Sequence, residues 1–156
     1  MIGDNNCKCN EVNLQIITII CSTNMKMKLN VGKAMDLAEI WASLSDRKKH
    51  KTGCVILDRG NRVISAGSNS DKTHPTQWRY ARKAGNEKAC HLHAEIAAII
   101  KLRDDDQPYS IFVTRLLRHN KRSMAKPCPI CQAALLDVGI SQVYFTNKNG
   151  DIEKMY

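Results

Sequence analysis

Apolar side chains recur every three or four positions in the segment 31–44, which places them on one face of an amphipathic helix. This apolar stripe consists of Ala34, Leu37, Ala38, Trp41 and Leu44. The basic stretch DRKKHKTG follows almost at once. The pattern therefore predicts a helix over 31–44 that leads into a cationic loop.

A strand-like pattern appears next, in the segment GCVILDRGNRVISAG. Two short apolar runs, 54–57 and 62–66, flank the turn-forming residues Asp-Arg-Gly-Asn, which predicts a β-hairpin. Residues 68–90 are polar and show no period, and Thr-His-Pro at 73–75 indicates a loop. We therefore expect irregular structure over 68–90.

The second half of the chain alternates between helical and strand patterns. A helix predicted over 91–103 is stopped by DDDQP, since three acidic residues and a proline disfavour its continuation. The remaining predicted elements are a buried strand 109–115, a helix 132–138 ended by Gly139, a strand 141–147, and a short last strand after the Asn-Gly turn at 149–150.

This order of elements predicts an α/β fold in which helices cover both faces of a mixed sheet. A chain of 156 residues has the length of one domain. We assign residues 29–156 to that domain and residues 1–28 to a strand-like or poorly ordered N-terminal extension. The extension holds the apolar run LQIITIIC at 14–21, which lacks the basic flank and the cleavage site of a signal peptide.

Composition bears on compartment and partners. No apolar run approaches the roughly twenty residues of a membrane span, so no membrane partner is expected. Seven cysteines without a regular framework favour a reducing compartment, and we expect a cytoplasmic protein. The formal net charge of +9 favours polyanionic partners, either nucleic acid or phosphorylated small molecules, although scattered surface lysines would give the same charge.

The fragment PCPIC sets Cys128 and Cys131 at a spacing that redox pairs and metal sites both use, and that two small buried side chains would also fit. The segment HLHAEIAAII adds His93 and Glu95 at a predicted helix start. A catalytic zinc takes three protein ligands and leaves the fourth place to water, and His93, Cys128 and Cys131 make up that number. Glu95 is then placed to handle the protons of the water.

Together, HAE at 93–95 and PCPIC at 127–131 resemble the H-x-E and P-C-x-x-C signature of zinc-dependent nucleoside, nucleotide and nucleobase deaminases. The resemblance extends over roughly residues 31–147. It implies a three-layer α/β/α sandwich with a mixed five-stranded sheet, as in cytidine deaminases, and one catalytic Zn²⁺. It also implies that Glu95 moves protons, that Asn69 hydrogen-bonds the sugar or base, and that the Ala94 amide helps to orient the base. The alternative for Asn69 is to satisfy its own loop backbone.

Two departures bear on the substrate. Asn69 and His93 lie 24 positions apart, which is similar to deoxycytidylate deaminases rather than to tRNA adenosine deaminases, yet Ala97 replaces the asparagine usual there. Arg115 ends a strand and opens the basic segment RLLRHNKRSMAK, which with the cations of 79–88 is predicted to wall an anionic-substrate pocket. The arginine-ended strand and the serine-preceded cysteine motif are also similar to stand-alone phage and viral deaminase-like proteins.

We therefore expect hydrolytic deamination of a cytosine nucleotide, of dCMP or CMP type, to the uracil product with release of ammonia. The resemblance also implies a homo-oligomer. Two other functions stay open: editing of bases in single-stranded nucleic acid or tRNA, which the aromatic content of 5% supports poorly, and a non-catalytic zinc-stabilised binding module, against which Glu95 counts. A second, structural zinc ion is a further alternative, with Cys7, Cys9, His74, Cys90 and His91 as loosely spaced candidate ligands.

Overall fold

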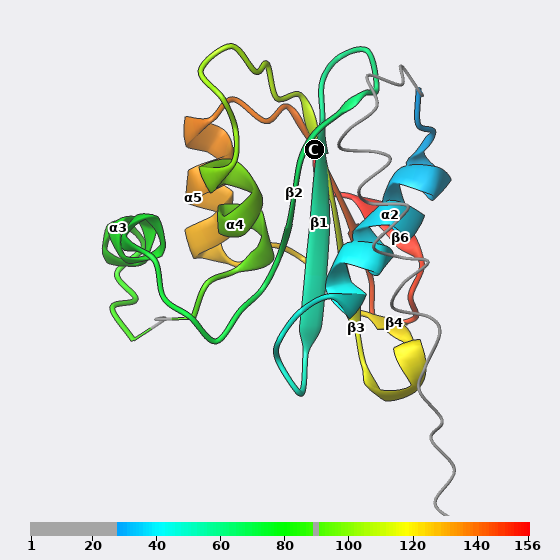
Figure 1. The fold of residues 1–156 in the computed structure, drawn as a ribbon, viewed down its shortest axis with the longest axis horizontal. Helices are drawn as coiled ribbons and strands as arrows, with labels where there is room; N and C mark the ends of the chain where they lie inside the picture. Colours follow the sequence, from blue (N-terminus) through cyan, green and yellow to red (C-terminus); the bar gives the residue numbers. More distant parts are fainter. Residues whose placement is uncertain (1–27, 89–90) are drawn as a thin grey trace, which may run out of the picture.

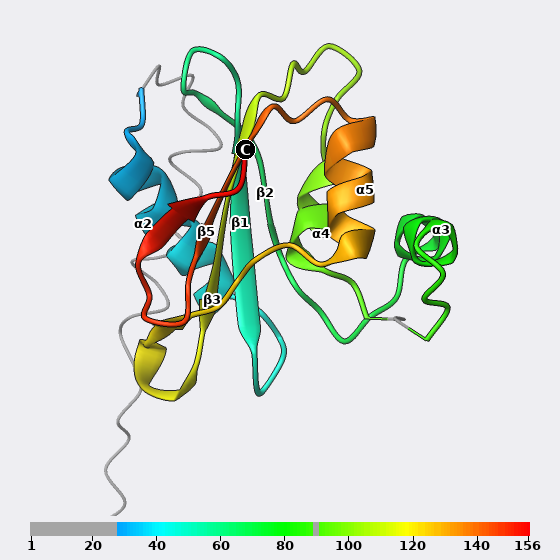
Figure 2. The same cartoon turned by 180° about the vertical axis from the view of Figure 1, so that it is seen from behind.

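The fold has three layers, with a mixed β-sheet between helix α2 (Val31–Ser43) on one face and helices α4 (Ala94–Ile100) and α5 (Pro129–Asp137) on the other (Figures 1 and 2). The computed structural model describes residues 28–88 and 91–156. Apart from Lys28, the predicted extension over 1–28 lies outside the described residues. Cys7, Cys9 and Cys90 lie outside them as well.

The sheet runs in the order β2-β1-β3-β5-β6, with β4 paired to β3 beside this path. The parallel pair is β3 with β5, and the other pairs are antiparallel. The strands are β1 Lys51–Leu57, β2 Val63–Ser68, β3 Ser110–Leu116, β4 Arg122–Ser123, β5 Gln142–Thr146 and β6 Ile152–Lys154. The predicted α/β sandwich is confirmed, and the two-residue β4 is an addition to the five expected strands.

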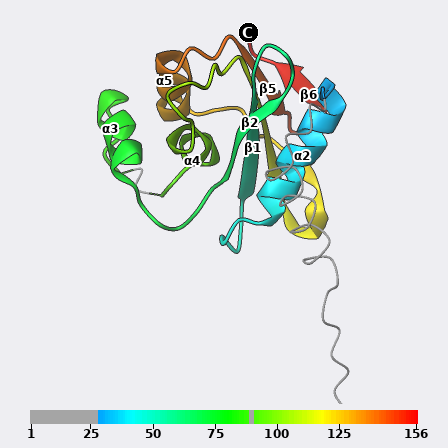
Figure 3. The same cartoon turned by 45° about the horizontal axis from the view of Figure 1, so that its top comes forward.

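The hydrophobic core lies on both faces of the sheet, because β1 is buried on both sides. Val55 and Leu57 face α2, whereas Cys54 and Ile56 face α4 and α5. Figure 3 shows these helices on opposite sides of the strands. Such two-sided burial explains why β1 reads as a continuous apolar run rather than as an alternating strand.

Two glycines let the helices approach the sheet closely. A Cβ atom on Gly67 would lie 2.5 Å from the carbonyl oxygen of Ala94 and 2.6 Å from the amide nitrogen of Ala98. A Cβ atom on Gly53 would lie 2.1 Å from the amide nitrogen of Ala42. Because these neighbours are backbone atoms, a larger residue would displace a whole helix. Gly67 therefore fixes where the first turn of α4 rests on β2.

Helix α3 (Pro75–Lys83) lies outside α4 and α5, in a segment for which the sequence predicted irregular structure (Figure 1). The prediction is wrong there because Thr-His-Pro begins a helix: His74 Nδ1 accepts a hydrogen bond from the Thr76 amide at 3.1 Å, and Pro75 occupies the first helical position. The buried side chains of α3 are Gln77, Tyr80 and Ala81. Three buried residues, one of them polar, do not form an apolar stripe, so the sequence of α3 shows no apolar periodicity.

The other elements differ from prediction at their ends. Helix α4 starts at Ala94 rather than at 91 and is capped by Lys101 rather than reaching 103. Helix α5 starts at Pro129 rather than at 132, because Cys128 is its N-cap and proline suits the first helical position. The basic segment after β3 forms a hairpin with a short 3₁₀ turn, Arg118–Asn120, before β4. No helix in the described ranges is both long and apolar enough to span a membrane.

Candidate active site

The starts of α4 and α5 bring three metal-binding side chains together. His93 is the N-cap of α4, Cys128 is the N-cap of α5, and Cys131 lies in the first turn of α5. The Nδ1 atom of His93 is 3.2 Å from Cys131 Sγ and 3.5 Å from Cys128 Sγ. The structure thus joins residues that are far apart in the sequence, as the zinc prediction requires.

The donor set fits one zinc ion. The ligand atoms of His93, Cys128 and Cys131 all lie within 4.8 Å of one another, and among residues 28–88 and 91–156 no second group of three such side chains occurs. One imidazole and two thiols are ligands that zinc prefers, and three protein ligands leave the open position of a catalytic site. A hydrogen bond from Cys131, helped by His93, lowers the pKa of Cys128 to about 4, which favours the thiolate that binds metal.

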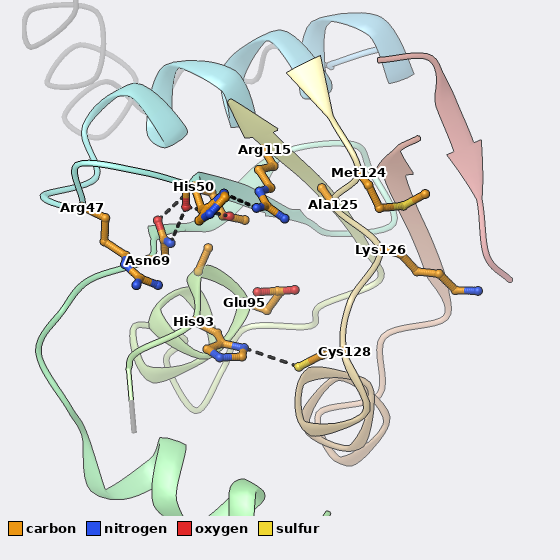
Figure 4. Close-up of a pocket in the computed structure, with 12 residues that line it drawn as sticks. Arg47, His50, Asn69, His93, Glu95, Arg115, Met124, Ala125, Lys126 and Cys128 are labelled. Atoms are coloured by element: carbon orange, nitrogen blue, oxygen red, sulfur yellow. Dashed lines mark hydrogen bonds between the residues drawn. The ribbon is translucent and has the colours of Figure 1, made fainter. Parts of the chain in front are cut away.

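Glu95 lies in the first turn of α4, beside the three ligands, and is 5% exposed. Its burial raises the pKa of the carboxyl group, because a low-dielectric surrounding disfavours the charged form. In Figure 4 the carboxylate lies between the His93–Cys128 pair and the Arg115 guanidinium. A buried carboxyl group beside a metal site is suited to accept and return protons.

A pocket of about 260 Å³ opens over these groups. At one end it is lined by His93, Ala94, Glu95 and Cys128. Its remaining lining residues are Arg47, His50, Thr52, Asn69, Arg115, Met124, Ala125 and Lys126 (Figure 4). The pocket therefore has a metal-binding end at the helix starts and a cationic end built from the α2–β1 loop, β3 and the segment after β4.

The family follows from a comparison with known proteins. A model of the cytidine and deoxycytidylate deaminase zinc-binding region matches residues 29–147. The chain belongs to this deaminase family. The match spans the metal-binding residues and the cationic end of the pocket alike.

This deaminase family member is similar to one curated protein and to several solved structures. It is 29% identical over 123 residues to an uncharacterized deaminase in the luxG 3′ region of Aliivibrio fischeri, covering 74% of this chain and 71% of that protein. It resembles the dCMP deaminase of cyanophage S-TIM5 with a TM-score of 0.53 and 23% identity, over 76% of this chain and 82% of that one. A second crystal structure of that cyanophage protein is a complex with dCMP and dUMP.

The likeness extends to the cytidine deaminase of Burkholderia pseudomallei, with a TM-score of 0.57 and 14% identity over 81% of this chain and 92% of that one. At these identities the solved structures show a shared fold.

Among the family's implied site residues, Ala94 is fully buried, and its carbonyl accepts a hydrogen bond from Cys54 Sγ at 3.2 Å. Its amide, at the first position of α4, has no acceptor within the helix, and the residue is among those that line the pocket.

Asn69 follows β2 at the wall of the pocket, where its side chain binds the loop between α2 and β1. Its Oδ1 accepts hydrogen bonds from the Ser45 hydroxyl at 2.7 Å and the Thr52 amide at 2.8 Å. Its Nδ2 donates to the carbonyl oxygen of His50 at 2.8 Å. An amide nitrogen carries two hydrogens, so one N–H remains beyond this bond. Asn69 thus holds the loop in place at the wall of the pocket.

Arg115 reaches the pocket from the end of β3. Its guanidinium contacts Nδ1 of His50, and its buried Nε has no hydrogen-bond partner. Arg47, on the facing loop, is paired with Asp71 at 3.0 Å, and Lys126 is exposed. Arg115 is therefore a half-buried cation with an unused donor at the pocket.

Not every cation predicted for the pocket wall is there. None of the predicted cations of 79–88 lines the pocket: Arg79, Arg82 and Lys83 are carried by α3, where Lys83 pairs with Asp137, and Lys88 is exposed beyond that helix. Arg122 lies on β4 and binds Asp36 and Glu39 of α2, both at 2.6 Å. Lys83 thus links α3 to α5 and Arg122 links β4 to α2, and neither lines the pocket.

Gln77 is a site residue that the sequence did not reveal. Its Oε1 accepts a hydrogen bond from the backbone amide of His93 at 3.1 Å, and its side chain is fully buried. Recognising it required the prediction of α3. On the same helix His74 serves as the N-cap, so it is engaged in a role other than the suggested second zinc site.

Proposed function

We propose that this protein hydrolytically deaminates a cytosine nucleotide of dCMP or CMP type and depends on zinc for that reaction. The observation that carries the proposal is the pocket itself, because it joins a buried carboxyl group and a metal-binding triad at one end to Arg115 and Lys126, which pair with no carboxylate in the described residues, at the other. A nucleotide has matching ends: a base with a reactive C4–amine bond and an anionic phosphate.

His93, Cys128 and Cys131 would hold the ion, which when bound supplies Lewis acidity that makes a water molecule a nucleophile at neutral pH. Glu95 takes a proton from this water as its oxygen adds to C4 of the cytosine ring. The carboxyl group then gives a proton to the ring nitrogen N3 and later carries one to the amine. The C4–N bond breaks, ammonia leaves, and a C4 carbonyl remains.

The rest of the pocket would orient the substrate. The Ala94 amide donates toward the ring edge, and the free N–H of Asn69 donates toward the sugar. Arg115 pairs with the phosphate, since a guanidinium with an unused donor binds phosphate oxygens well. The cyanophage S-TIM5 relative, which was crystallised with dCMP and dUMP, agrees with a substrate of this class.

A non-catalytic zinc-binding module fits less well. A structural zinc is usually enclosed by four protein ligands, whereas the described residues supply three. Such a module would also have no use for a carboxyl group kept buried next to the metal-binding side chains. We further propose that the protein acts in the cytoplasm, since seven cysteines without a regular framework favour a reducing compartment, and as a homo-oligomer, as its family resemblance implies.

The test incubates zinc-loaded protein with each of dCMP, CMP, deoxycytidine, cytosine and adenosine. Turnover is measured as ammonia release and as formation of the product base. We expect the highest kcat/KM for a cytosine monophosphate. A protein that binds one zinc ion per chain but turns over none of these compounds would overturn the proposal.

A further inference from the structure

Four exposed cations lie just outside the cationic end of the pocket, and we call them the basic rim. They are Lys48 and Lys49 of the α2–β1 loop and Arg118 and Lys121 of the β3–β4 hairpin. The register of the sheet brings the two segments together, because Lys51 pairs with Leu116 at the end where the loop enters β1 and the hairpin leaves β3. Figures 1 and 3 both show loop and hairpin at the same end of the sheet.

The basic rim is not neutralised by the protein. None of its four cations forms an ion pair with a carboxylate in the described part of the chain, whereas Arg62, Lys83, Arg103 and Arg122 each do. Neither of the two carboxylates near the loop forms an ion pair with a rim cation. Asp46 accepts hydrogen bonds from Ser70 and the Asp71 amide, and Asp71 pairs with Arg47.

The basic rim adjoins the cationic end of the pocket. Lys48 and Lys49 follow Arg47 along the chain, and Arg118 lies three positions beyond Arg115, so each rim segment adjoins a residue that lines the pocket. Arg115 foremost, and also Arg47 and Lys49, lower the pKa of His50 through charge repulsion. The loop and strand end thus share one positive field at the mouth of the pocket.

This charge exceeds what a mononucleotide needs. One phosphate would be met by Arg115 and Lys126 inside the pocket, which leaves the basic rim without a role in the proposed function. Phosphates that continue along a strand from the bound nucleotide would leave the pocket over the rim. A base inside a duplex would not reach Glu95 without being flipped out, so an unpaired strand fits this arrangement better.

We propose that the basic rim binds the phosphodiester backbone of a single-stranded nucleic acid, one nucleotide of which occupies the pocket. The inference rests on the proposed function for the occupant of the pocket, while binding at the rim requires no catalysis. Recognition is by charge along the backbone, without the stacking on aromatic side chains that many single-strand-binding proteins add.

The test measures binding of a fluorescent 15-nucleotide strand, oligothymidine with one central deoxycytidine, by anisotropy across 50–200 mM salt. Each phosphate contact on a single strand contributes about 0.7 to the slope of log affinity against log salt. Contacts from all four rim cations predict a wild-type slope of at least about 2.8 in magnitude. The double variants Lys48→Gln/Lys49→Gln and Arg118→Gln/Lys121→Gln should each reduce the magnitude of this slope by about 1.4. If a variant and the wild type bind equally at 200 mM salt, this change means that the variant binds about sevenfold more weakly at 50 mM salt.

The matched control is Lys33→Gln/Arg59→Gln, which removes two exposed cations at the opposite end of the sheet, where the Leu29 amide binds the Asn61 carbonyl. An equal loss in this control, or equally tight binding of the same strand as a duplex, would show diffuse attraction and overturn the inference. Binding to anionic vesicles with no binding to the strand would overturn it in favour of a membrane surface. Wild-type protein that deaminates dCMP but does not bind the strand refutes the rim alone; the reverse result refutes the proposed function alone.

Discussion

The two ends of the pocket are built in different ways. At the metal-binding end, His93, Glu95 and Cys131 are carried by the first turns of helices that pack on the sheet, and Glu95 and Cys131 are buried. At the cationic end, Arg47 comes from a loop and Arg115 from the end of a strand, and both are partly exposed. Helix starts give fixed positions, whereas loop and strand ends give charge with more freedom.

This difference suggests a division of work. Reaction chemistry needs groups held within a fraction of an ångström, and packed helices provide that precision. Recognition of a phosphate tolerates more movement, because electrostatic attraction falls off slowly with distance. Changes at the metal-binding end should therefore act on turnover, and changes at the cationic end on affinity and on the choice of substrate.

The largest expected effect is that of Glu95→Gln, which keeps the size of the side chain and removes its ability to take a proton. General acid–base catalysis contributes about 10²- to 10⁴-fold, and Glu95 is proposed to act in several steps, so kcat for dCMP should fall at least about 10³-fold. Bound zinc, measured by atomic absorption, should remain at one ion per chain.

The exposed residue Glu87 offers the matched control for this change. Glu87→Gln removes one carboxylate on the surface and should leave kcat within about twofold of the wild type, as surface substitutions usually do. Retained turnover in Glu95→Gln would mean that protons move through another group, and the proposed role of the metal-binding end would then be wrong.

Next in size is Arg115→Gln at the cationic end. Loss of a charge-assisted hydrogen bond to phosphate is worth about 2 kcal/mol, so kcat/KM for dCMP should fall about 30-fold, mainly through KM. Deoxycytidine, which has no phosphate, should be affected little. Arg59→Gln serves as the control, because it removes an exposed arginine remote from the pocket. An equal loss on both substrates would place Arg115 at the base or in the fold instead of at the phosphate.

The sequence predicted the metal-binding end of the pocket better than the cationic end. His93, Glu95, Cys128 and Cys131 were identified because metal ligation restricts residue type and spacing so strongly that few alternatives remain. The structure brings the three ligands together, and the roles assigned to Asn69, Ala94 and Arg115 stay predictions. Cations carry no such restriction: Arg115 faces the pocket and Arg122 of the same segment binds α2, a distinction that depends on the pairing of β3 with β4.

The elements of the fold were also predicted with unequal success. Helix α2, which has a clear apolar period, and the core strands, which are short apolar runs, were predicted close to their observed ranges. Helix α3 was missed, since its helical start is made by His74 and Pro75, which also suit a loop, and since it buries only a short polar-rich face. Long-range contacts, such as the one from Gln77 to His93, could not be predicted without that helix.

Gln77→Met tests the metal-binding end through a residue that lies outside the pocket. The substitution removes the acceptor of the His93 amide and also an Nε2 that is buried without a partner. Groups that orient metal ligands typically contribute about 10- to 100-fold to metal affinity, so the zinc dissociation constant should rise about tenfold in a chelator competition. The melting temperature of the zinc-free protein separates the roles: a drop there with unchanged zinc affinity would make Gln77 purely structural.

The smallest effect concerns His50, which reports on the charge at the cationic end. Arg115 is the main cause that lowers the pKa of His50 below 6.5, so Arg115→Gln should raise that pKa in an NMR titration of the imidazole. Because the folded pKa is depressed, the folded state binds fewer protons than the unfolded state as pH falls below about 6.5, and His50 then lowers stability. The same variant should weaken this acid-side loss of stability.

The same NMR titration of His50, repeated with substrate bound, tests where the phosphate lies. A phosphate bound beside Arg115 would offset the positive field and raise the pKa of His50 in the Glu95→Gln protein, in which substrate is not consumed. Binding of dCMP should therefore shift the His50 titration upward, whereas deoxycytidine at saturation should leave it in place. Equal shifts with both ligands would mean that the base or sugar, rather than the phosphate, lies at the cationic end, and the proposed orientation of the nucleotide would have to be reversed.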